Sequence, residues 1–317
     1  MGRQTLTFVL RGGISLALLA LLPLLGFVDL GRTAQLMVGA DPAFLLLAVV
    51  LLTGDRFLMA AKWRLLLQAR DVALPFGSAA RAYYVASFAG LFLPMTVGAD
   101  VVRTFAVAPR FRNPTLVASI ILERVLGALS QALLAAAAGF LLAHLAGAPL
   151  GGLAWGLGAV IAVAALAGPL SFRLAAWMTR WPGRPPLGGK LRAWAQVYLD
   201  FSIHRGTLLI FLVLSLVEGL FAVAIHYAAG RALGLQVSLA LFMATVPIVF
   251  LIARIPVSLG GIGVVESSFV VLAGRIGLGA TEAFALALLA EALLLISLLP
   301  GALFAIGPAP AHSQGKL

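Results

Sequence analysis

Long apolar segments separated by short polar ones run along this chain from end to end. They lack the two-residue alternation of membrane strands, and several are long enough to cross a bilayer as helices. Two further apolar segments, 78–93 and 239–254, are too short to cross, and each leads into a stretch containing Pro and Gly. The pattern predicts an all-α, polytopic integral membrane protein with about six full transmembrane helices and two shorter hairpins.

The polar boundaries place the elements along a single transmembrane domain that covers residues 1–317. A first half covers about 1–143 and a second half about 206–317. Between them, residues 171–205 are rich in Arg and Trp, and predict a cytoplasmic linker with a helix lying on the membrane surface. A polar loop is expected at 29–41. The predicted spans are 14–28, 43–61, 114–143, 152–170, 207–229 and 281–306.

The two short segments end in matching patterns of Pro, apolar residue, Thr or Ser, apolar residue and Gly. The first runs from Pro94 to Gly98 and the second from Pro256 to Gly260, about half the chain apart. Short segments interrupted by Pro and Gly at corresponding places in two halves point to the substrate site of a transporter. We therefore expect two re-entrant, broken-helix hairpins in an inverted repeat. The alternative is a pair of ordinary loops between helices.

Composition and charge place the protein in a membrane and orient it. Of 317 residues 62% are hydrophobic and 10% are charged, with a mean hydropathy of +1.09. The net charge is +11, and Lys and Arg number two in 1–11, eight in 56–112 and six in 173–205, whereas the intervening loops hold one, none and one. This bias predicts that both termini lie in the cytoplasm and that the protein contacts anionic lipid rather than nucleic acid.

Residue usage argues against most catalytic chemistry. The chain has no cysteine, and its four histidines are scattered without metal-ligand spacing. No nucleotide-binding motif, Ser/His/Asp set or catalytic domain is recognisable. We expect no cofactor, no metal and no enzymatic activity.

Charged residues follow the first break at spacings that suit an anion. Asp100 and Arg103 are three positions apart, so they share a face and can pair if a helix resumes after Gly98. Glu123 and Arg124 follow on the next long helix, within reach. Because guanidinium groups bind phosphate oxygens through two parallel hydrogen bonds, we expect Arg103 and Arg124 to bind a lipid head group, oriented by the two carboxylates.

The second break has a different character. Gly260, Gly261 and Gly263 remove side chains and let the backbone approach a ligand, while Glu266 adds negative charge to contact the substrate or to carry protons. The alternative is that Glu266 pairs with Arg254 and only holds the hairpin together.

A further pair of charges lies inside the second predicted span. Asp55 and Arg56 are adjacent in sequence and point about 100° apart on a helix, so each is expected to need a separate partner or an aqueous cavity. Alternatively, Arg56 extends to the cytoplasmic surface.

Several of these motifs together resemble the lysylphosphatidylglycerol synthase transmembrane family, also called the flippase-like domain family. The likeness covers nearly the whole chain. The motifs are Trp63-Arg64 with Leu66 and Leu67, the run from Leu93 through Gly98 and Asp100 to Arg103, Glu123-Arg124, and the run from Pro256 to Glu266.

The resemblance implies an inner-membrane protein that moves a lipid between leaflets, such as an aminoacylated phosphatidylglycerol, a polyprenyl-linked sugar or a hopanoid-type lipid. Bifunctional members carry a C-terminal aminoacyltransferase domain, which this sequence lacks, so we expect no lysyl-lipid synthesis by this chain. Two other classes stay open. One is a secondary transporter of a small solute or ion, and the other is a membrane subunit that anchors a separate lipid-modifying enzyme. For partners, the alternatives are a homo-oligomer and such an enzyme.

Overall fold

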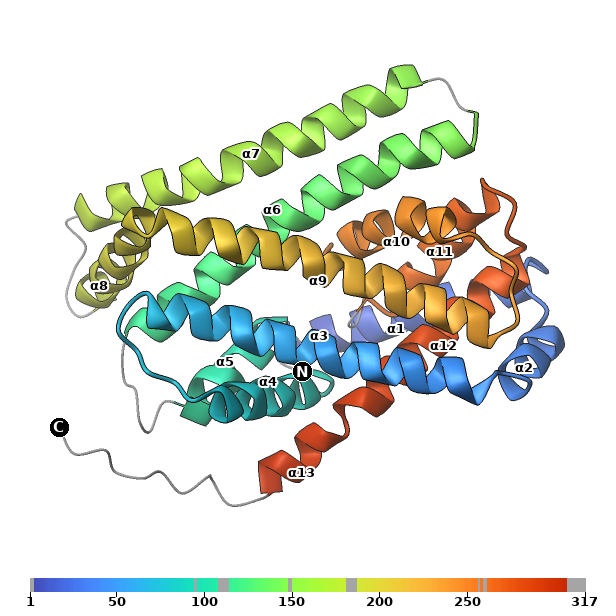
Figure 1. The fold of residues 1–317 in the computed structure, drawn as a ribbon, viewed down its shortest axis with the longest axis horizontal. Helices are drawn as coiled ribbons and strands as arrows, with labels where there is room; N and C mark the ends of the chain where they lie inside the picture. The colour runs from blue at the N-terminus through green and yellow to red at the C-terminus, as the bar shows by residue number, and fades with distance from the viewer. Residues whose placement is uncertain are drawn as a thin grey trace.

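A computed structural model describes residues 3–93, 96–107, 114–147, 150–180, 187–255, 257–258 and 261–306. Within these ranges the chain is helical, with short connections and no strand (Figure 1). The all-α prediction is confirmed. A polytopic membrane protein is equally supported, because five helical segments are long and apolar enough to cross a bilayer.

The five segments match five of the predicted spans. They lie in α3 (Pro42–Gln68), α6 (Pro114–Leu145), α7 (Leu150–Arg180), α9 (Arg205–Ala232), and α12 (Ala280–Leu298) continued by α13 (Pro300–Ile306). The sixth predicted span, 14–28, corresponds to α1 (Arg3–Leu24), whose apolar part Leu10–Leu24 is shorter than the others. The total of six therefore stays a prediction.

The region around α3 differs from the prediction in two places, the end of α3 and the loop before it. Asp41 accepts a hydrogen bond from the Ala43 amide at 2.8 Å and Pro42 occupies the first turn, so the helix begins where expected. It continues to Gln68 instead of ending near residue 61. The expected loop 29–41 instead holds α2 (Leu30–Val38), because Asp29 caps it by accepting from the Arg32 amide at 2.9 Å.

Two helical hairpins pack against the long helices. One consists of α4 (Phe76–Gly90) and α5 (Thr96–Val107), beside the end of α3; the other consists of α10 (Leu239–Ala253) and α11 (Val264–Gly274), beside the end of α9 (Figure 1). Helices α3 and α9 lie side by side, and α6 crosses the molecule in contact with α5 and α10. Helix α6 therefore touches both hairpins.

The apolar core divides into three clusters that follow this arrangement. One lies among α9, α10, α11 and α12 and contains Phe242 and Phe269. A second joins α3 to α4 and contains Trp63. The third joins α6 to the α7–α8 region and contains Phe201 and Phe211.

The linker 171–205 contains a helix, as predicted, and the position of that helix on the membrane surface stays a prediction. Helix α7 continues to Arg180, and α8 (Leu187–Asp200) packs against α6 and α7. The Tyr198 side chain is 4% exposed and its hydroxyl lies 2.8 Å from Ser171 Oγ, while Phe201, just beyond α8, is fully buried. Burial raises the pKa of the Tyr198 phenol. These aromatic groups face the bundle rather than lipid, whereas Trp177 and Trp194 stay exposed.

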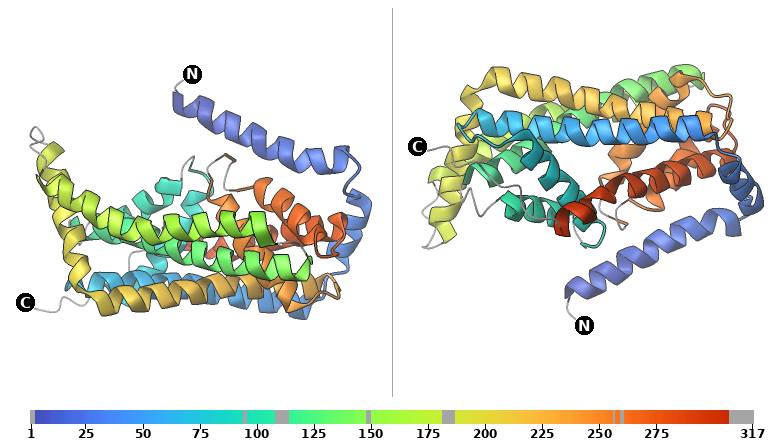
Figure 2. Two further views of the ribbon diagram at one scale, coloured as in Figure 1. Left: turned by 90° about the horizontal axis from the view of Figure 1, so that it is seen from above. Right: turned by 60° about the horizontal axis from the view of Figure 1, so that its bottom comes forward.

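Helix α1 lies at the edge of the bundle and packs mainly against α11 (Figure 2). The contact is closest at Gly263, which has a positive φ of 83°. A Cβ at this position would lie 2.8 Å from the Ser15 carbonyl oxygen and 2.7 Å from Leu18 Cβ. A side chain would therefore collide with α1, and glycine permits the approach.

Candidate functional site

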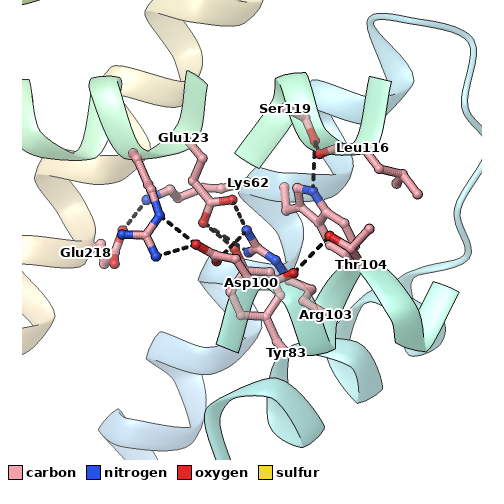
Figure 3. Close-up of polar contacts among 11 residues, drawn as sticks. Lys62, Tyr83, Asp100, Arg103, Thr104, Leu116, Ser119, Glu123 and Glu218 are labelled. Carbon is pink, nitrogen blue, oxygen red and sulfur yellow. Dashed lines mark hydrogen bonds and ion pairs between the residues drawn. The ribbon is translucent and has the colours of Figure 1, made fainter. Parts of the chain in front are cut away.

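Arg103 is the centre of a polar cluster inside the bundle (Figure 3). Its side chain is 3% exposed, and its Nη2 lies 2.9 Å from Glu123 Oε2 and 3.3 Å from Asp100 Oδ1. The predicted pairing of Asp100 with Arg103 is therefore confirmed, and α6 supplies a second carboxylate. A buried guanidinium is stable only when paired in this way.

Two aromatic rings enclose the same guanidinium. The Arg103 Cζ atom lies 4.7 Å from the centroid of the Trp63 ring and 4.4 Å from that of Tyr83. Trp63 is fully buried and donates from Nε1 to Ser119 Oγ at 3.1 Å, and the Tyr83 hydroxyl donates to Glu123. Rings, carboxylates and hydrogen bonds thus hold the Arg103 guanidinium, while its buried Nε makes no hydrogen bond. Sequence reasoning noted Trp63 only within the family motif and gave Tyr83 no role.

Arg124 lies at the open side of this cluster. It pairs with Asp100, so that carboxylate lies between two guanidinium groups. In contrast to Arg103, the Arg124 side chain is 46% exposed. The two neighbouring side chains therefore lie on different sides of the cluster. Glu123 points inward to Arg103, and Arg124 lies at the exposed side.

A second set of charges joins α3 to α9. Lys62, 3% exposed, pairs with Glu218 of α9, and its Nζ lies 4.7 Å from the centroid of the Phe211 ring. The predicted span 43–61 leaves Lys62 just outside the membrane helix. Because α3 extends to Gln68, Lys62 lies inside that helix and forms a buried pair.

The expectation for Asp55 and Arg56 is wrong. Arg56 Nη2 lies 2.8 Å from Asp55 Oδ2, and Nη1 lies 3.4 Å from Ser87 Oγ of α4. The Cα–Cβ directions diverge as expected, but the arginine side chain is long enough to fold back to the adjacent carboxylate. The two side chains therefore pair with each other, while the buried Arg56 Nε makes no hydrogen bond.

Arg254 approaches the same part of α6 from the other hairpin. It directly follows the last residue of α10, where a cation is favoured by the helix dipole, and its Nη2 donates to the Gly127 carbonyl at 3.2 Å. The side chain is exposed, and no carboxylate in the described ranges lies within ion-pair distance of it. Gly127 is one turn beyond Arg124, so guanidinium groups associated with the two hairpins converge on one face of α6.

The balance of charge in this region is positive. Among the described residues, five cations and four carboxylates take part, which leaves one positive charge unmatched. The cations are Arg56, Lys62, Arg103, Arg124 and Arg254, and the carboxylates are Asp55, Asp100, Glu123 and Glu218. Since Arg124 and Arg254 are the exposed cations, the cluster can accept one anion at that point.

Glu266 lies at the start of α11, where its carboxylate accepts a backbone hydrogen bond, and its predicted contact with substrate or protons stays a prediction. Its Oε2 accepts from the Gly263 amide at 2.7 Å at the start of α11, and the side chain is 1% exposed. Such a contact caps the helix. The described residues contain no ion pair between Glu266 and Arg254, so the expected alternative of a Glu266–Arg254 pair is wrong.

The glycines of the two breaks serve the folding of the chain. A Cβ on Gly98 would lie 2.7 Å from Leu93 Cβ, so α5 folds back closely on the end of α4. Gly261 has a φ of 90°, which favours glycine, and the close neighbours of Gly263 belong to α1. The positions Pro94, Pro256 and Gly260 lie outside the described residues.

The sequence model of one protein family, described as the lysylphosphatidylglycerol synthase TM region, matches residues 8–301. The chain belongs to this family. The matched region is the membrane region of such synthases rather than a catalytic domain. Comparison with curated proteins and with solved structures gives no match. The motif residues Trp63, Arg103, Glu123 and Asp100, which carried the resemblance from separate parts of the sequence, form one contact network in this member.

Proposed function

We propose that this protein moves an anionic lipid between membrane leaflets and binds the head-group phosphate between Arg124 and Arg254. The observation that supports the proposal is the convergence of these two exposed guanidinium groups on one turn of α6, in a cluster with one unmatched positive charge. Each guanidinium offers two parallel N–H groups that fit phosphate oxygens.

Depth in the membrane strengthens the argument. Arg124 is ten residues beyond the start of α6, or roughly 15 Å along a helix, which is about half of the hydrocarbon thickness. A charged side chain at this depth costs at least ~2.5 kcal/mol unless it is paired or solvated. Arg124 already pairs with Asp100, whereas Arg254 has no carboxylate within ion-pair distance among the described residues, so an anion bound between them supplies the negative charge that the cluster lacks.

The residues predicted from sequence take different parts in this proposal. Arg103 does not contact the phosphate, because its guanidinium is enclosed; it positions Asp100, which in turn holds Arg124. Glu123 positions Arg103. Arg124 keeps the role given to it from the sequence, and Arg254 joins it.

The placement of the two hairpins supports alternating access. Hairpin α4–α5 lies toward one end of the bundle and α10–α11 toward the other, with α6 between them (Figure 1). In our proposal both are re-entrant, the halves are related by inversion, and both termini are cytoplasmic in an inner membrane. A phosphate bound near the middle of α6 is then accessible from alternate sides.

The test is leaflet exchange of head-group-labelled phosphatidylglycerol in liposomes that contain the purified protein. We expect exchange with the unaltered protein and its loss in Arg124→Ala and Arg254→Ala, each of which removes an exposed side chain. Arg275→Ala is the matched control, since this arginine is also exposed and lies in no part of the cluster. Exchange that survives both site variants contradicts the assigned site.

Exchange of no lipid by folded protein, across a panel of phosphatidylglycerol, an aminoacylated phosphatidylglycerol and a polyprenyl phosphate, contradicts the translocase itself. Uptake of inorganic phosphate by the same liposomes, in place of lipid exchange, identifies a solute transporter.

A further inference from the structure

An apolar cavity of about 90 Å³ opens between α6, α9 and α10. Eight residues line it, and none of them carries a polar side chain. They are Leu134, Ala137, Ala138, Leu141, Leu220, Val223, Met243 and Pro247. Leu220 and Met243 are 46% and 42% exposed, so the cavity opens at the outer surface of the bundle.

The cavity continues one face of α6 that begins at the proposed head-group site. One stripe of the helix contains residues spaced three, four, three and seven positions apart, which is the repeat of a single helical face. These residues are Arg124, Gly127, Gln131, Leu134 and Leu141. The stripe changes from charged to polar to apolar along its length. From Arg124 to Leu134 it extends roughly 15 Å, and to Leu141 roughly 25 Å.

Helix α10 presents a matching stripe in the opposite direction. Arg254 donates to the Gly127 carbonyl at 3.2 Å, and Gln131 Nε2 donates to the Pro247 carbonyl at 2.7 Å. Met243, one turn before Pro247, then faces the cavity. Helices α6 and α10 therefore place Arg124 and Arg254 at one end of the stripe, and apolar side chains such as Leu134 and Met243 at the other end.

Close packing of α9 holds the apolar end in shape. A Cβ at Gly219 would overlap Leu134 Cδ1, so glycine permits α9 to approach α6 beside the cavity. Leu220 and Val223, on the following turn of α9, complete the lining. The arrangement depends on side chains from both halves of the protein.

We propose that the α6–α10 stripe holds one hydrocarbon chain of the lipid whose phosphate binds Arg124 and Arg254, with the chain in the cavity at Leu134, Ala138 and Met243. This inference rests on the proposed function. The occupant follows from the amphiphilic order of the stripe, since a guanidinium pair complements an anionic head group and the apolar cavity complements a hydrocarbon tail.

The direction of the stripe indicates the leaflet from which the bound lipid comes. The cationic end is nearer to Pro114, where α6 begins, and the apolar end is nearer to Leu145, where it ends. A lipid lying along it has its head group toward the Pro114 side and its tail toward the other side. That is the orientation of a lipid from the leaflet on the Pro114 side, so this conformation holds lipid taken from that leaflet.

The experiment uses two photoreactive phosphatidylglycerols in liposomes with the full chain, one with a diazirine at the chain terminus and one with a diazirine next to the carbonyl. Cross-linked residues are identified by mass spectrometry. We expect the terminal label at Leu134, Leu141 and Met243, and the carbonyl label near Gly127 and Gln131. Equal labelling of the stripe and of the lipid-facing α7 residues Val163 and Leu166 by both probes overturns the inference.

The second measurement repeats the cross-linking with a variant in which a large side chain fills the cavity. Ala137→Trp introduces a ring from an exposed position that lines the cavity, and Ala159→Trp makes the same change at an exposed position of α7. We expect Ala137→Trp to lose the terminal-label cross-links and Ala159→Trp to keep them. Retained cross-links in the filled variant contradict the tail site.

Cross-linking and exchange separate the two proposals. Stripe-selective labelling without lipid exchange supports the tail site and contradicts the translocase. Exchange without stripe-selective labelling supports the translocase and contradicts the tail site.

Discussion

The guanidinium of Arg103 lies 4.7 Å from the indole ring of Trp63, on a helix more than thirty positions away in sequence. The same indole donates to Ser119 Oγ at 3.1 Å, so three helices meet at this contact. Stacking requires a planar cation, and a planar fork also suits the two carboxylates beside it. The contact therefore selects arginine over lysine at position 103.

Replacement of Arg103 by alanine is expected to destabilise the protein by about 3–5 kcal/mol, because Glu123 and Asp100 would lose a buried partner. Arg103→Lys restores charge without stacking and is expected to recover only part of the loss. Thermal unfolding in detergent measures both. Arg275→Ala, an exposed substitution, serves as the control, and unfolding of Arg103→Ala at the unaltered temperature would contradict the structural role.

The Lys62–Glu218 pair offers a test by double substitution. Lys62→Met alone leaves Glu218 without its partner, and Glu218→Gln alone leaves Lys62 charged beside Phe211. We expect each to cost about 3–5 kcal/mol and the double variant to be less destabilised than the Lys62→Met single variant. A thermal double-mutant cycle gives the coupling energy. Strict additivity would show that the two groups do not interact.

Substitution of Gly263 tests whether α1 packs closely against the start of α11. Gly263→Ala places a Cβ 2.8 Å from the Ser15 carbonyl oxygen at a φ of 83°, so both contact and backbone conformation are strained. We expect a loss of about 1–3 kcal/mol and faster proteolysis of α1. Gly274→Ala, where a Cβ meets nothing within 4 Å, is the control. Equal behaviour of the two variants would show that α1 packs elsewhere.

Glu266 distinguishes helix capping from proton carriage. Glu266→Gln keeps an oxygen that accepts from the Gly263 amide but cannot release a proton, whereas Glu266→Ala removes the acceptor. If the side chain only caps α11, Gln retains lipid exchange and Ala loses about 0.5–2 kcal/mol of stability. Exchange that is abolished in the stable Gln variant would instead support the proton-carrying role predicted from the sequence.

Much of this structure could be predicted from the order of polar and apolar residues. The long helices follow from apolar length, and the start of α3 follows from Asp41 and Pro42. Pairing of Asp100 with Arg103 follows from their spacing on one helix. Each of these depends on residues that are close in sequence.

The remaining parts depend on contacts between distant segments. Trp63 and Tyr83 enclose Arg103 only because α3 and α4 pack beside α5, and no local pattern encodes that neighbourhood. The length of α3 decided whether Lys62 was a surface cation or the buried partner of Glu218. For Arg56, the reach of a flexible side chain overrode the angle between adjacent positions.

Helix α6 contacts Asp100 of one hairpin through Arg124 and Arg254 of the other through the Gly127 carbonyl. The two attachment points are one turn apart on a stiff rod of 32 residues. We therefore expect α6 to couple the two hairpins, because a rotation of this helix about its axis changes its contacts with both of them at once.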